Sequence, residues 1–212
     1  LITSKNGEIC GAKLENKRDI YATSVVLTTG TFLNGMIHIG EKTIPAGRVG
    51  EAPSLGLANY LSSLGLIMGR LKTGTPPRLE KKSIDWQRLE AQFGDEVPEP
   101  FSSLTKKIEN KQVECRLSWT NKEVHQIIKK NINKSAMYSG KLDVKGPRYC
   151  PSIEDKIMRF SDRERHQIFL EPEGLDDETI YPNGISTSLP ENVQRDFISK
   201  IPGLDRVKIL RP

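Results

Sequence analysis

The 212-residue sequence has few cysteines, few aromatic residues and no long apolar run. Its three cysteines, Cys10, Cys115 and Cys150, are odd in number and far apart, which excludes a disulfide framework and favours free thiols in a reducing compartment. No apolar stretch approaches the roughly 18 to 20 residues that a bilayer requires, and no signal region is present. The three histidines lack the spacing of a metal-binding pair, so no metal site is expected. These absences predict a soluble protein with free thiols.

Composition and charge describe a globular chain with one basic segment. Hydrophobic residues make up 36% and charged residues 28%, with 17 Gly and 13 Pro, which excludes collagen, coiled coil and bulk disorder. The net charge is +5, but residues 105–148 carry eleven Lys and Arg against four Asp and Glu. Such a concentrated positive field suits a polyanion such as nucleic acid, although a solvated basic face is the commoner explanation.

The N-terminal part has the pattern of strands. Asn6-Gly7 is a hairpin signal and the polar residues 16–19 turn the chain again, so three antiparallel strands are expected. The β-branched run 24–30 then predicts a buried parallel strand. Because ligands of α/β sheets bind beyond the carboxyl ends of such strands, Gly30 and Thr31 are expected beside a cofactor.

Signals in the middle of the chain are mixed. Ser54 is a candidate N-cap for a helix that runs through Leu64 and stops at Gly65. Residues 66–72 have the pattern of a strand. Residues 79–113 predict an irregular insertion with one short helix near 85–93, because Pro98 and Pro100 interrupt the pattern.

Two pairs of residues in the second half have the spacing of capping boxes. Thr120 with Glu123 predicts the start of an amphipathic basic helix, on which His125 would be partly exposed. Ser188 with Glu191 predicts a second helix that ends at 202–203. Strands are expected over 167–170 and 180–187, and near the C-terminal end.

Cys150 has sequence neighbours that can activate a thiol, which the other two cysteines lack. Pro151 fits the first position of a short helix, which would place the thiol at the positive end of the helix, and Arg148 is two residues away. Both effects favour the thiolate, the form that acts as a nucleophile. The spacing alone leaves a lone, inert cysteine as the commoner alternative, and Cys10 and Cys115 are expected to be structural.

Basic residues beside glycine-bearing turns are candidates for anion binding. Arg48, Arg70, Lys72 and Arg78 lie in or next to such turns, where main-chain amides and guanidinium groups can approach phosphate oxygens. Ordinary loops with salt bridges explain them equally well. The sequence has no G-x-G-x-x-G fingerprint and no P-loop, so any dinucleotide site in it is incomplete.

Five stretches of this sequence carry a family resemblance: residues 25–35, 69–78, 146–160, 168–174 and 181–190. They closely resemble the MnmG (GidA) family of tRNA uridine 5-carboxymethylaminomethyl modification enzymes, and the resemblance covers essentially the whole chain. The resemblance implies an enzyme that uses FAD and NADH, with methylene-tetrahydrofolate as one-carbon donor and glycine or ammonium as amine, to modify the wobble uridine of tRNA. It also implies a homodimer that works with the GTPase MnmE.

The resemblance also assigns residues. Gly30, Thr31 and Ser54 match the FAD contacts of the family, and Cys150 matches a cysteine proposed to act on the uracil ring. Residues 146–160 match the segment assigned to NAD: Gly146, Pro147, Arg148, Tyr149, Cys150, Pro151, Ser152, Ile153, Glu154, Asp155, Lys156, Ile157, Met158, Arg159 and Phe160. The basic residues taken as tRNA contacts are Arg48, Lys72, Arg78, Lys129 and Lys130.

These expectations combine into one hypothesis. Addition of the Cys150 thiolate to C6 of uracil would make C5 nucleophilic. The fold implied is α/β, part of a glutathione-reductase-like FAD-binding fold. Residues 1–75 would form the end of the FAD domain and the start of an insertion, and residues 76–212 an inserted mixed α/β domain. The N-terminal FAD fingerprint is missing, so an internal fragment that is inactive alone is expected.

Three alternatives remain at this point. One is a non-catalytic tRNA-binding fragment, another is a folate- and FAD-dependent tRNA uridine methyltransferase, and the third is a different flavin oxidoreductase with a small-molecule substrate. The compartment expected is the bacterial cytoplasm, or the mitochondrial matrix in a eukaryote.

Overall fold

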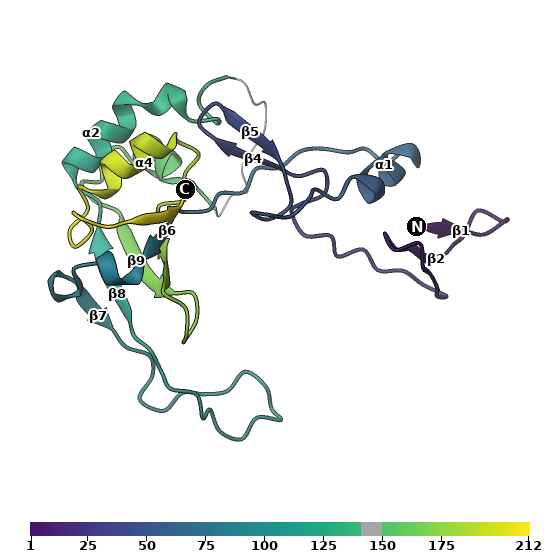
Figure 1. Cartoon of the computed structure of the whole chain (residues 1–212), viewed down its shortest axis with the longest axis horizontal. Helices are drawn as coiled ribbons and strands as arrows, with labels where there is room; N and C mark the ends of the chain where they lie inside the picture. Colours follow the sequence, from purple (N-terminus) through teal and green to yellow (C-terminus); the bar gives the residue numbers. More distant parts are fainter. Residues whose placement is uncertain (141–149) are drawn as a thin grey trace. The chain divides into compact units, whose positions relative to one another are not determined.

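The computed structural model describes residues 1–140 and 150–212, and these form two compact units (Figure 1). Unit 1 comprises Leu1–His38 and Thr43–Arg70, and unit 2 comprises Ile39–Lys42 and Leu71–Pro212. Gly146 to Tyr149, which belong to the predicted NAD segment, lie outside the described residues. Within the described ranges, no helix is long and apolar enough to cross a bilayer. The structure is a mixture of helices and sheets, as the sequence predicts.

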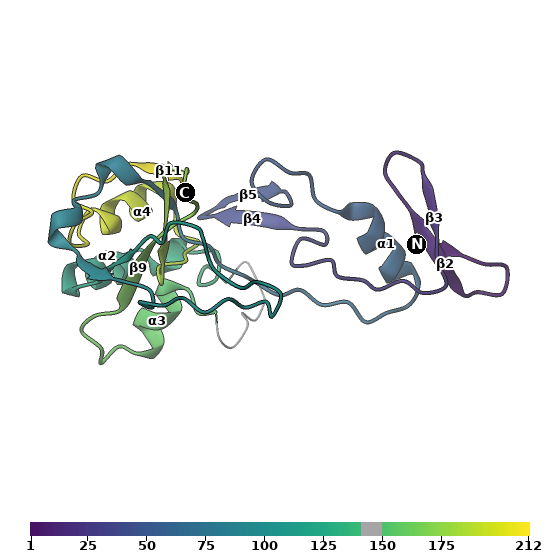
Figure 2. The same ribbon diagram turned by 90° about the horizontal axis from the view of Figure 1, so that it is seen from below.

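Unit 1 contains a small antiparallel sheet and one helix (Figure 2). The sheet order is β1-β2-β3, with β1 at Ile2–Thr3, β2 at Ile9–Lys13 and β3 at Asp19–Tyr21, which confirms the three predicted strands. Gly7 adopts a φ of 84° in the first turn, a conformation in which glycine costs little. Helix α1 spans Leu55–Ser63 and ends before Gly65, which has the predicted left-handed conformation with a φ of 76°.

Two predicted strands are absent. Residues 24–30 and 66–72 form none of the strands, and their apolar side chains include Val26, Leu27 and Ile67, all exposed. A buried parallel strand needs paired neighbours and covering helices on both faces. No described residue of unit 1 supplies them, so the predicted strand pattern is not realised in this chain.

A hairpin that the sequence analysis missed follows the 24–30 segment. Strand β4 spans Met36–Ile39 and strand β5 spans Lys42–Pro45. Gly40 in the turn has a φ of 57°, and its N–H donates to the Ser188 carbonyl oxygen at 2.7 Å, within unit 2. A Cβ at Gly40 would lie 2.6 Å from Pro190 Cγ, so the close approach requires glycine.

Unit 2 is built on a six-stranded antiparallel sheet with the order β11-β6-β10-β9-β8-β7. In chain order the strands are β6 (Arg78–Glu80), β7 (Glu90–Gln92), β8 (Cys115–Trp119), β9 (Gln167–Pro172), β10 (Thr179–Asn183) and β11 (Ile209–Arg211). Short 3-10 helices occur at η1 (Lys81–Ser83), η2 (Trp86–Arg88) and η3 (Ile132–Lys134). Strand β9 alternates buried Ile168 and Leu170 with half-buried Gln167 and Phe169, so one side of it faces the core.

Three helices pack with this sheet: α2 (Lys122–Lys130), α3 (Ile153–Arg159) and α4 (Glu191–Ile198) (Figure 1). Apolar side chains from the helices and the strands share one core. Its members include Leu79, Val124, Ile128, Ile153, Ile157, Ile168, Leu170, Ile180, Leu189, Val193, Phe197 and Ile201. The predicted amphipathic character of α2 is confirmed, because Val124 and Ile128 are fully buried while Lys129 and Lys130 are exposed.

Both predicted capping boxes are wrong by a residue or two. Helix α2 is capped by Asn121, whose side chain accepts from the Val124 N–H at 3.0 Å. Thr120 instead shares a hydrogen bond with His125 Nε2 at 2.8 Å, so His125 is buried rather than partly exposed. Helix α4 begins after Pro190, and Ser188 bonds to buried partners. The hydroxyls of Thr120 and Ser188, which the local spacing assigned to helix caps, therefore form tertiary hydrogen bonds instead.

Candidate functional site

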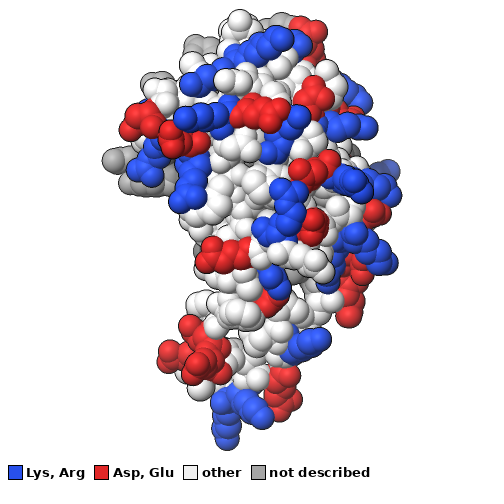
Figure 3. Space-filling model, turned by 90° about the vertical axis from the view of Figure 1, so that its left-hand side faces the viewer, with Lys and Arg blue, Asp and Glu red and all other residues white. Residues whose placement is uncertain are grey.

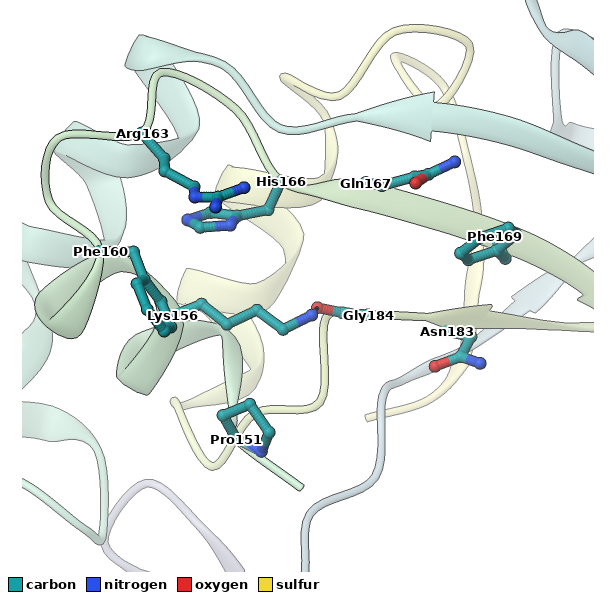
Figure 4. A pocket seen from close by; sticks show the side chains of 9 residues that line it. All are labelled: Pro151, Lys156, Phe160, Arg163, His166, Gln167, Phe169, Asn183 and Gly184. Carbon is teal, nitrogen blue, oxygen red and sulfur yellow. Dashed lines mark hydrogen bonds between the residues drawn. The ribbon is translucent and has the colours of Figure 1, made fainter. Parts of the chain in front are cut away.

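A pocket of about 350 Å³ in unit 2 opens between α3 and one end of strands β9 and β10 (Figure 4). These strands are antiparallel, with Asn183 opposite Phe169, so the start of β9 and the end of β10 meet there. The pocket is lined by Pro151, Lys156, Phe160, Arg163, His166, Gln167, Phe169, Asn183 and Gly184. Its lining contains two cationic side chains and no acidic one, so its electrostatics favour an anion.

Helix α3, which carries Lys156 into the pocket, is anchored by a capping box. The Ser152 hydroxyl accepts from the Asp155 N–H at 3.2 Å, and the Asp155 carboxylate accepts from the Ser152 N–H at 3.1 Å. The helix therefore starts after Ser152, and Pro151 lies outside it. The expectation that Pro151 opens the helix is wrong, because the S-x-x-D spacing satisfies the first-turn amides better than proline does. Cys150 thus lies two residues before the N-cap.

A cluster of buried polar side chains also holds helix α3 in place. Asp155 accepts from the Tyr138 hydroxyl at 3.0 Å and lies 3.8 Å from Lys72 Nζ. Burial opposes ionisation of Asp155, but hydrogen bonds from Ser152 and Tyr138 and the Lys72 cation outweigh it and lower the pKa of Asp155. Burial and the Asp155 contact raise the pKa of Tyr138 to about 12. Glu154, fully buried, accepts from Thr187 Oγ1 at 3.0 Å. The two carboxylates hold α3 and do not line the pocket.

Lys156 crosses the pocket to reach the end of β10. Its Nζ donates to the Gly184 carbonyl oxygen at 2.9 Å. Burial lowers the pKa of Lys156, whereas the nearby Cys150 sulfur, as an anion, raises it. Gly184 has a φ of 111°, and a Cβ there would lie 2.6 Å from the Gln167 carbonyl oxygen, so no other residue fits. The lysine is therefore placed by main-chain geometry.

His166 lies at the inner wall of the pocket, below Arg163 in Figure 4. It is 8% exposed, and within the described part of the chain its Nε2 atom has no hydrogen-bond partner. Its ring centroid is 5.4 Å from that of His125. Burial lowers the pKa of His166, and His125, Lys156 and Arg163 lower it further, so the ring is neutral at pH 7.

The three cysteines differ in surroundings. Cys150 is exposed and directly precedes Pro151 of the pocket wall. Burial and the charge of Glu171 raise the pKa of Cys115, so its thiol is protonated at neutral pH. The Cys10 thiol donates to the Ile2 carbonyl oxygen at 3.6 Å. Exposure therefore distinguishes Cys150 from the other two cysteines, while its role remains a prediction.

Residues predicted to bind NAD divide into three groups. Pro151, Lys156 and Phe160 line the pocket. Ser152, Glu154 and Asp155 anchor α3, and Ile153 and Ile157 belong to the core, so these side chains are buried, and their contact with a cofactor stays a prediction. Met158 and Arg159 are exposed at the end of the helix. The 3.6-residue period of α3 explains the division, because consecutive residues of a helix cannot all face one ligand.

The residues predicted to contact FAD lie close together in unit 1. Gly30 and Thr31 form an exposed turn, in which Gly30 has a φ of 60° and open space around it. Asn34 N–H donates to the Ser54 carbonyl oxygen at 3.0 Å, which ties the end of this turn region to the start of α1. Ser54 occupies the N-cap position, but its hydroxyl makes no capping hydrogen bond. Binding of FAD by these three residues stays a prediction.

The basic residues predicted to contact tRNA have different environments. Lys72 is 12% exposed beside Asp155, and Arg78 is held by Glu173, by Thr75 Oγ1 and by the ring of Tyr181. Both residues already have partners within unit 2, and their contact with tRNA stays a prediction. Arg48 is exposed and paired with Glu51 at 2.7 Å. Lys129 and Lys130 are exposed on α2 and form no ion pair among the described residues.

Charge of one sign does not dominate the face drawn in Figure 3. Lysine and arginine side chains alternate there with aspartate and glutamate. Among the described residues, Lys122 of the basic segment pairs with Glu164 at 3.1 Å, and Glu123 of the same segment pairs with Lys200 at 2.9 Å. Lys122 is therefore one cation of the segment that an acidic residue from elsewhere in the chain neutralises.

The sequence predicts no role for several pocket residues. Arg163 and Gln167 lie in none of the recognised stretches, Asn183 lies in one without an assigned function, and His166 was considered only as a metal ligand. The available signal was the stretch 181–190, which was recognised as a family motif without a function. In the described ranges, no group of three or more His, Cys, Asp or Glu could hold a metal ion.

Comparison with known proteins identifies the family. The model of the family described as Glucose inhibited division protein A matches residues 1–212. The tRNA uridine 5-carboxymethylaminomethyl modification enzyme MnmG of Granulibacter bethesdensis is 56% identical over 214 residues, which cover 100% of this chain and 34% of the relative. The enzyme of the same name from Thermodesulfovibrio yellowstonii is 53% identical over 211 residues, again 100% of this chain and 34% of the relative.

The fold agrees with a solved structure. The structure of Aquifex aeolicus GidA in its form I crystal superposes with a TM-score of 0.88 at 48% identity, covering 100% of this chain and 36% of that chain. The chain thus spans about a third of the length of the proteins it matches. Since the family model matches every residue, this chain belongs to the Glucose inhibited division protein A (GidA, MnmG) family.

Proposed function

We propose that this chain carries part of the active site of a tRNA wobble-uridine modification enzyme, which adds a 5-carboxymethylaminomethyl group at C5. The observation that supports this most is the exposed Cys150 beside a cationic pocket, in a chain that belongs to the MnmG family. The relatives bear the name of that activity, and the resemblance of residues 146–160 to the NAD segment of the family agrees with the pocket position of Pro151, Lys156 and Phe160.

The chemical role proposed for Cys150 is nucleophilic. Its thiolate adds to C6 of the uracil, forming an S–C6 bond, and the electrons of the C5–C6 double bond move to C5. C5 then attacks the one-carbon unit. Loss of the C5 proton and departure of the thiolate restore the ring. Lys156 is the pocket cation proposed to lie beside the reacting sulfur, since its pKa responds to the charge of Cys150.

The residues present fit the proposed cofactors to different degrees. The cationic pocket of unit 2 is suited to the phosphates of NADH. In unit 1 the open turn at Gly30 allows close approach of a ligand, and the unbonded Ser54 hydroxyl is available to one, so these residues fit one edge of an FAD site. When bound, a flavin supplies hydride transfer and methylene-tetrahydrofolate supplies the carbon.

Contacts to tRNA, to MnmE and to a second subunit are part of the same proposal. Lys129 and Lys130 on α2, which form no ion pair among the described residues, are the proposed contacts for RNA phosphates, with Arg48 as a weaker candidate because Glu51 neutralises it. The GTPase MnmE and a homodimer follow from the family resemblance. The cytoplasm is the proposed compartment, since the relatives named above are bacterial.

Replacement of Cys150 tests the proposed function. In the protein as its genome encodes it, Cys150→Ala should abolish the wobble modification, measured by mass spectrometry of tRNA nucleosides. Cys115→Ala is the matched control and should retain activity, because the Cys115 thiol is protonated and lies in β8. Unchanged modification in Cys150→Ala would contradict the nucleophilic role.

A further inference from the structure

Asp155 holds the chain on both sides of Cys150. On the N-terminal side, the Tyr138 hydroxyl donates to Asp155 Oδ1 at 3.0 Å. On the C-terminal side, the Ser152 N–H donates to Asp155 Oδ2 at 3.1 Å, and the Ser152 hydroxyl donates to the same oxygen at 3.0 Å. One carboxylate is therefore the common anchor of the chain before and after Cys150.

The burial of this anchor exceeds what a helix cap requires. A capping box needs one serine and one carboxylate, and both can lie at the surface. Asp155 is instead buried, and the Lys72 side chain beside it has an Nζ atom with no hydrogen-bond partner among the described residues. Buried ion pairs stabilise a fold little better than apolar residues of similar volume do, so stability alone gives no reason for this one. A buried polar network does, however, hold the groups that it joins in a single arrangement.

The arrangement sets the places of two groups of the proposed reaction. Cys150 lies two residues before the N-cap Ser152, and Lys156 directly follows Asp155 in α3. Burial lowers the pKa of Lys156 and the charge of Cys150 raises it, so the ammonium group and the sulfur lie within electrostatic range of each other. Movement of the first turn of α3 would therefore move Cys150 and Lys156 relative to any bound ring.

We propose that Asp155 is a positioning residue for Cys150, which keeps the sulfur in place for attack on C6 of uracil by fixing the main chain on both sides of it. The inference rests on the proposed function, because Asp155 has this role only if Cys150 is the nucleophile. Asp155 does not line the pocket, and it acts through Ser152 and Tyr138. Rates depend steeply on such placement, since a displacement of about 1 Å can cost roughly a hundredfold.

Steady-state kinetics of uridine modification by the complete protein, measured below the melting temperature of each variant, test the inference. Asp155→Ala should lower kcat roughly a hundredfold and change the KM for tRNA less than about twofold. Asp155→Asn should restore much of kcat, because its amide oxygen can accept from the Ser152 N–H while its amide nitrogen donates to the Tyr138 oxygen. Tyr138→Phe removes only one hydrogen bond, so it remains available if Asp155→Ala does not fold, and it should lower kcat roughly tenfold.

Ser118→Ala is the matched control for lost stability. It removes a buried hydrogen bond of unit 2, in which the Ser118 hydroxyl donates to the Pro202 carbonyl oxygen at 2.8 Å. This variant should have a lower melting temperature but a kcat within about twofold of the wild type. An equal fall of kcat in Ser118→Ala and Asp155→Ala would overturn the inference, because general destabilisation would then explain both.

Three other results would also overturn it. The first is wild-type kcat in Asp155→Ala or in Tyr138→Phe. The second is a higher KM for tRNA with unchanged kcat, which would assign the cluster to tRNA binding. The third is a kcat of Asp155→Asn as low as that of Asp155→Ala. If Cys150→Ala is inactive while any of these holds, the positioning role fails and the proposed function stands, whereas active Cys150→Ala contradicts both.

Discussion

Unit 2 buries a continuous cluster of aliphatic side chains with Phe197 at 0% exposure, whereas in unit 1 the buried apolar residues are Ala46, Ala58 and Leu61. Unit 1 instead exposes large apolar side chains, such as Val26 at 83% and Ile67 at 103%. The sequences of both units contain strand and helix patterns, but the two units differ in how many apolar side chains they bury. The pocket of unit 2 is therefore built on an apolar core that this chain supplies. The residues predicted to contact FAD, in unit 1, are supported by few buried apolar side chains.

Removal of core volume should have the largest effect and separates the two units. Leu170→Ala, at a fully buried position of β9, should lower the free energy of unfolding by about 2 to 5 kcal/mol. Leu66→Ala, at a position 54% exposed in unit 1, should change it by less than about 0.5 kcal/mol. Urea unfolding followed by tryptophan fluorescence reports on unit 2, since Trp86 and Trp119 both lie there. An equal shift of the transition by the two variants would refute the difference between the cores.

The predictions from sequence succeed where local pattern and tertiary partner agree. The three strands of unit 1, the stop at Gly65 and the apolar face of α2 follow from turn chemistry and helical period, and the structure has them. The strand predicted over residues 24–30 is absent, because a strand pattern in the sequence indicates that a segment can pair but not that a partner is present. Its pairing partners are absent from the described residues, so tertiary context decides against the strand.

The functional site shows the same limit. Cys150 and Lys156 were found because they fall in one recognisable stretch of sequence. Asn183 reaches the pocket through the antiparallel pairing of β10 with β9, and Arg163 lies in the connection between α3 and β9; no local spacing encodes either placement. The partner of Lys72 could not be predicted for a related reason, because Asp155 is far away in the sequence, and the contact of Lys72 with RNA stays a prediction.

Helix capping sharpens the comparison at a smaller scale. Ser152 and Ser54 both occupy N-cap positions, but only the Ser152 hydroxyl caps its helix, and it is 1% exposed. Ser152→Ala should lower the free energy of unfolding by about 1 to 2 kcal/mol, while Ser54→Ala should cost only a few tenths. The two variants can be compared by thermal unfolding followed by circular dichroism. Equal losses of unfolding free energy in the two variants would contradict this difference, because they would show that the Ser54 hydroxyl also caps its helix.

Acidification should have the smallest effect, and it should act on unit 2. The pKa values of His125 and His166 are lowered in the folded state, chiefly by burial, from an unfolded value of about 6.5. Below about pH 6.5 the unfolded chain therefore binds protons that the folded chain does not, so stability falls as the pH decreases. His166→Gln should reduce this loss in the tryptophan-monitored transition. His38→Gln removes a histidine of unit 1 and is the control; if it reduces the loss equally, the histidine pair is not responsible.

The central claim is that Cys150, at the edge of the unit 2 pocket, bonds to the uracil ring. A tRNA with 5-fluorouridine at the wobble position would trap that bond, since fluorine at C5 cannot leave as a proton. Under turnover conditions, mass spectrometry of the digested complete enzyme should find the nucleotide attached to the peptide that contains Cys150. A nucleotide attached to Cys10 or Cys115, or no attachment while ordinary tRNA is being modified, would contradict the account.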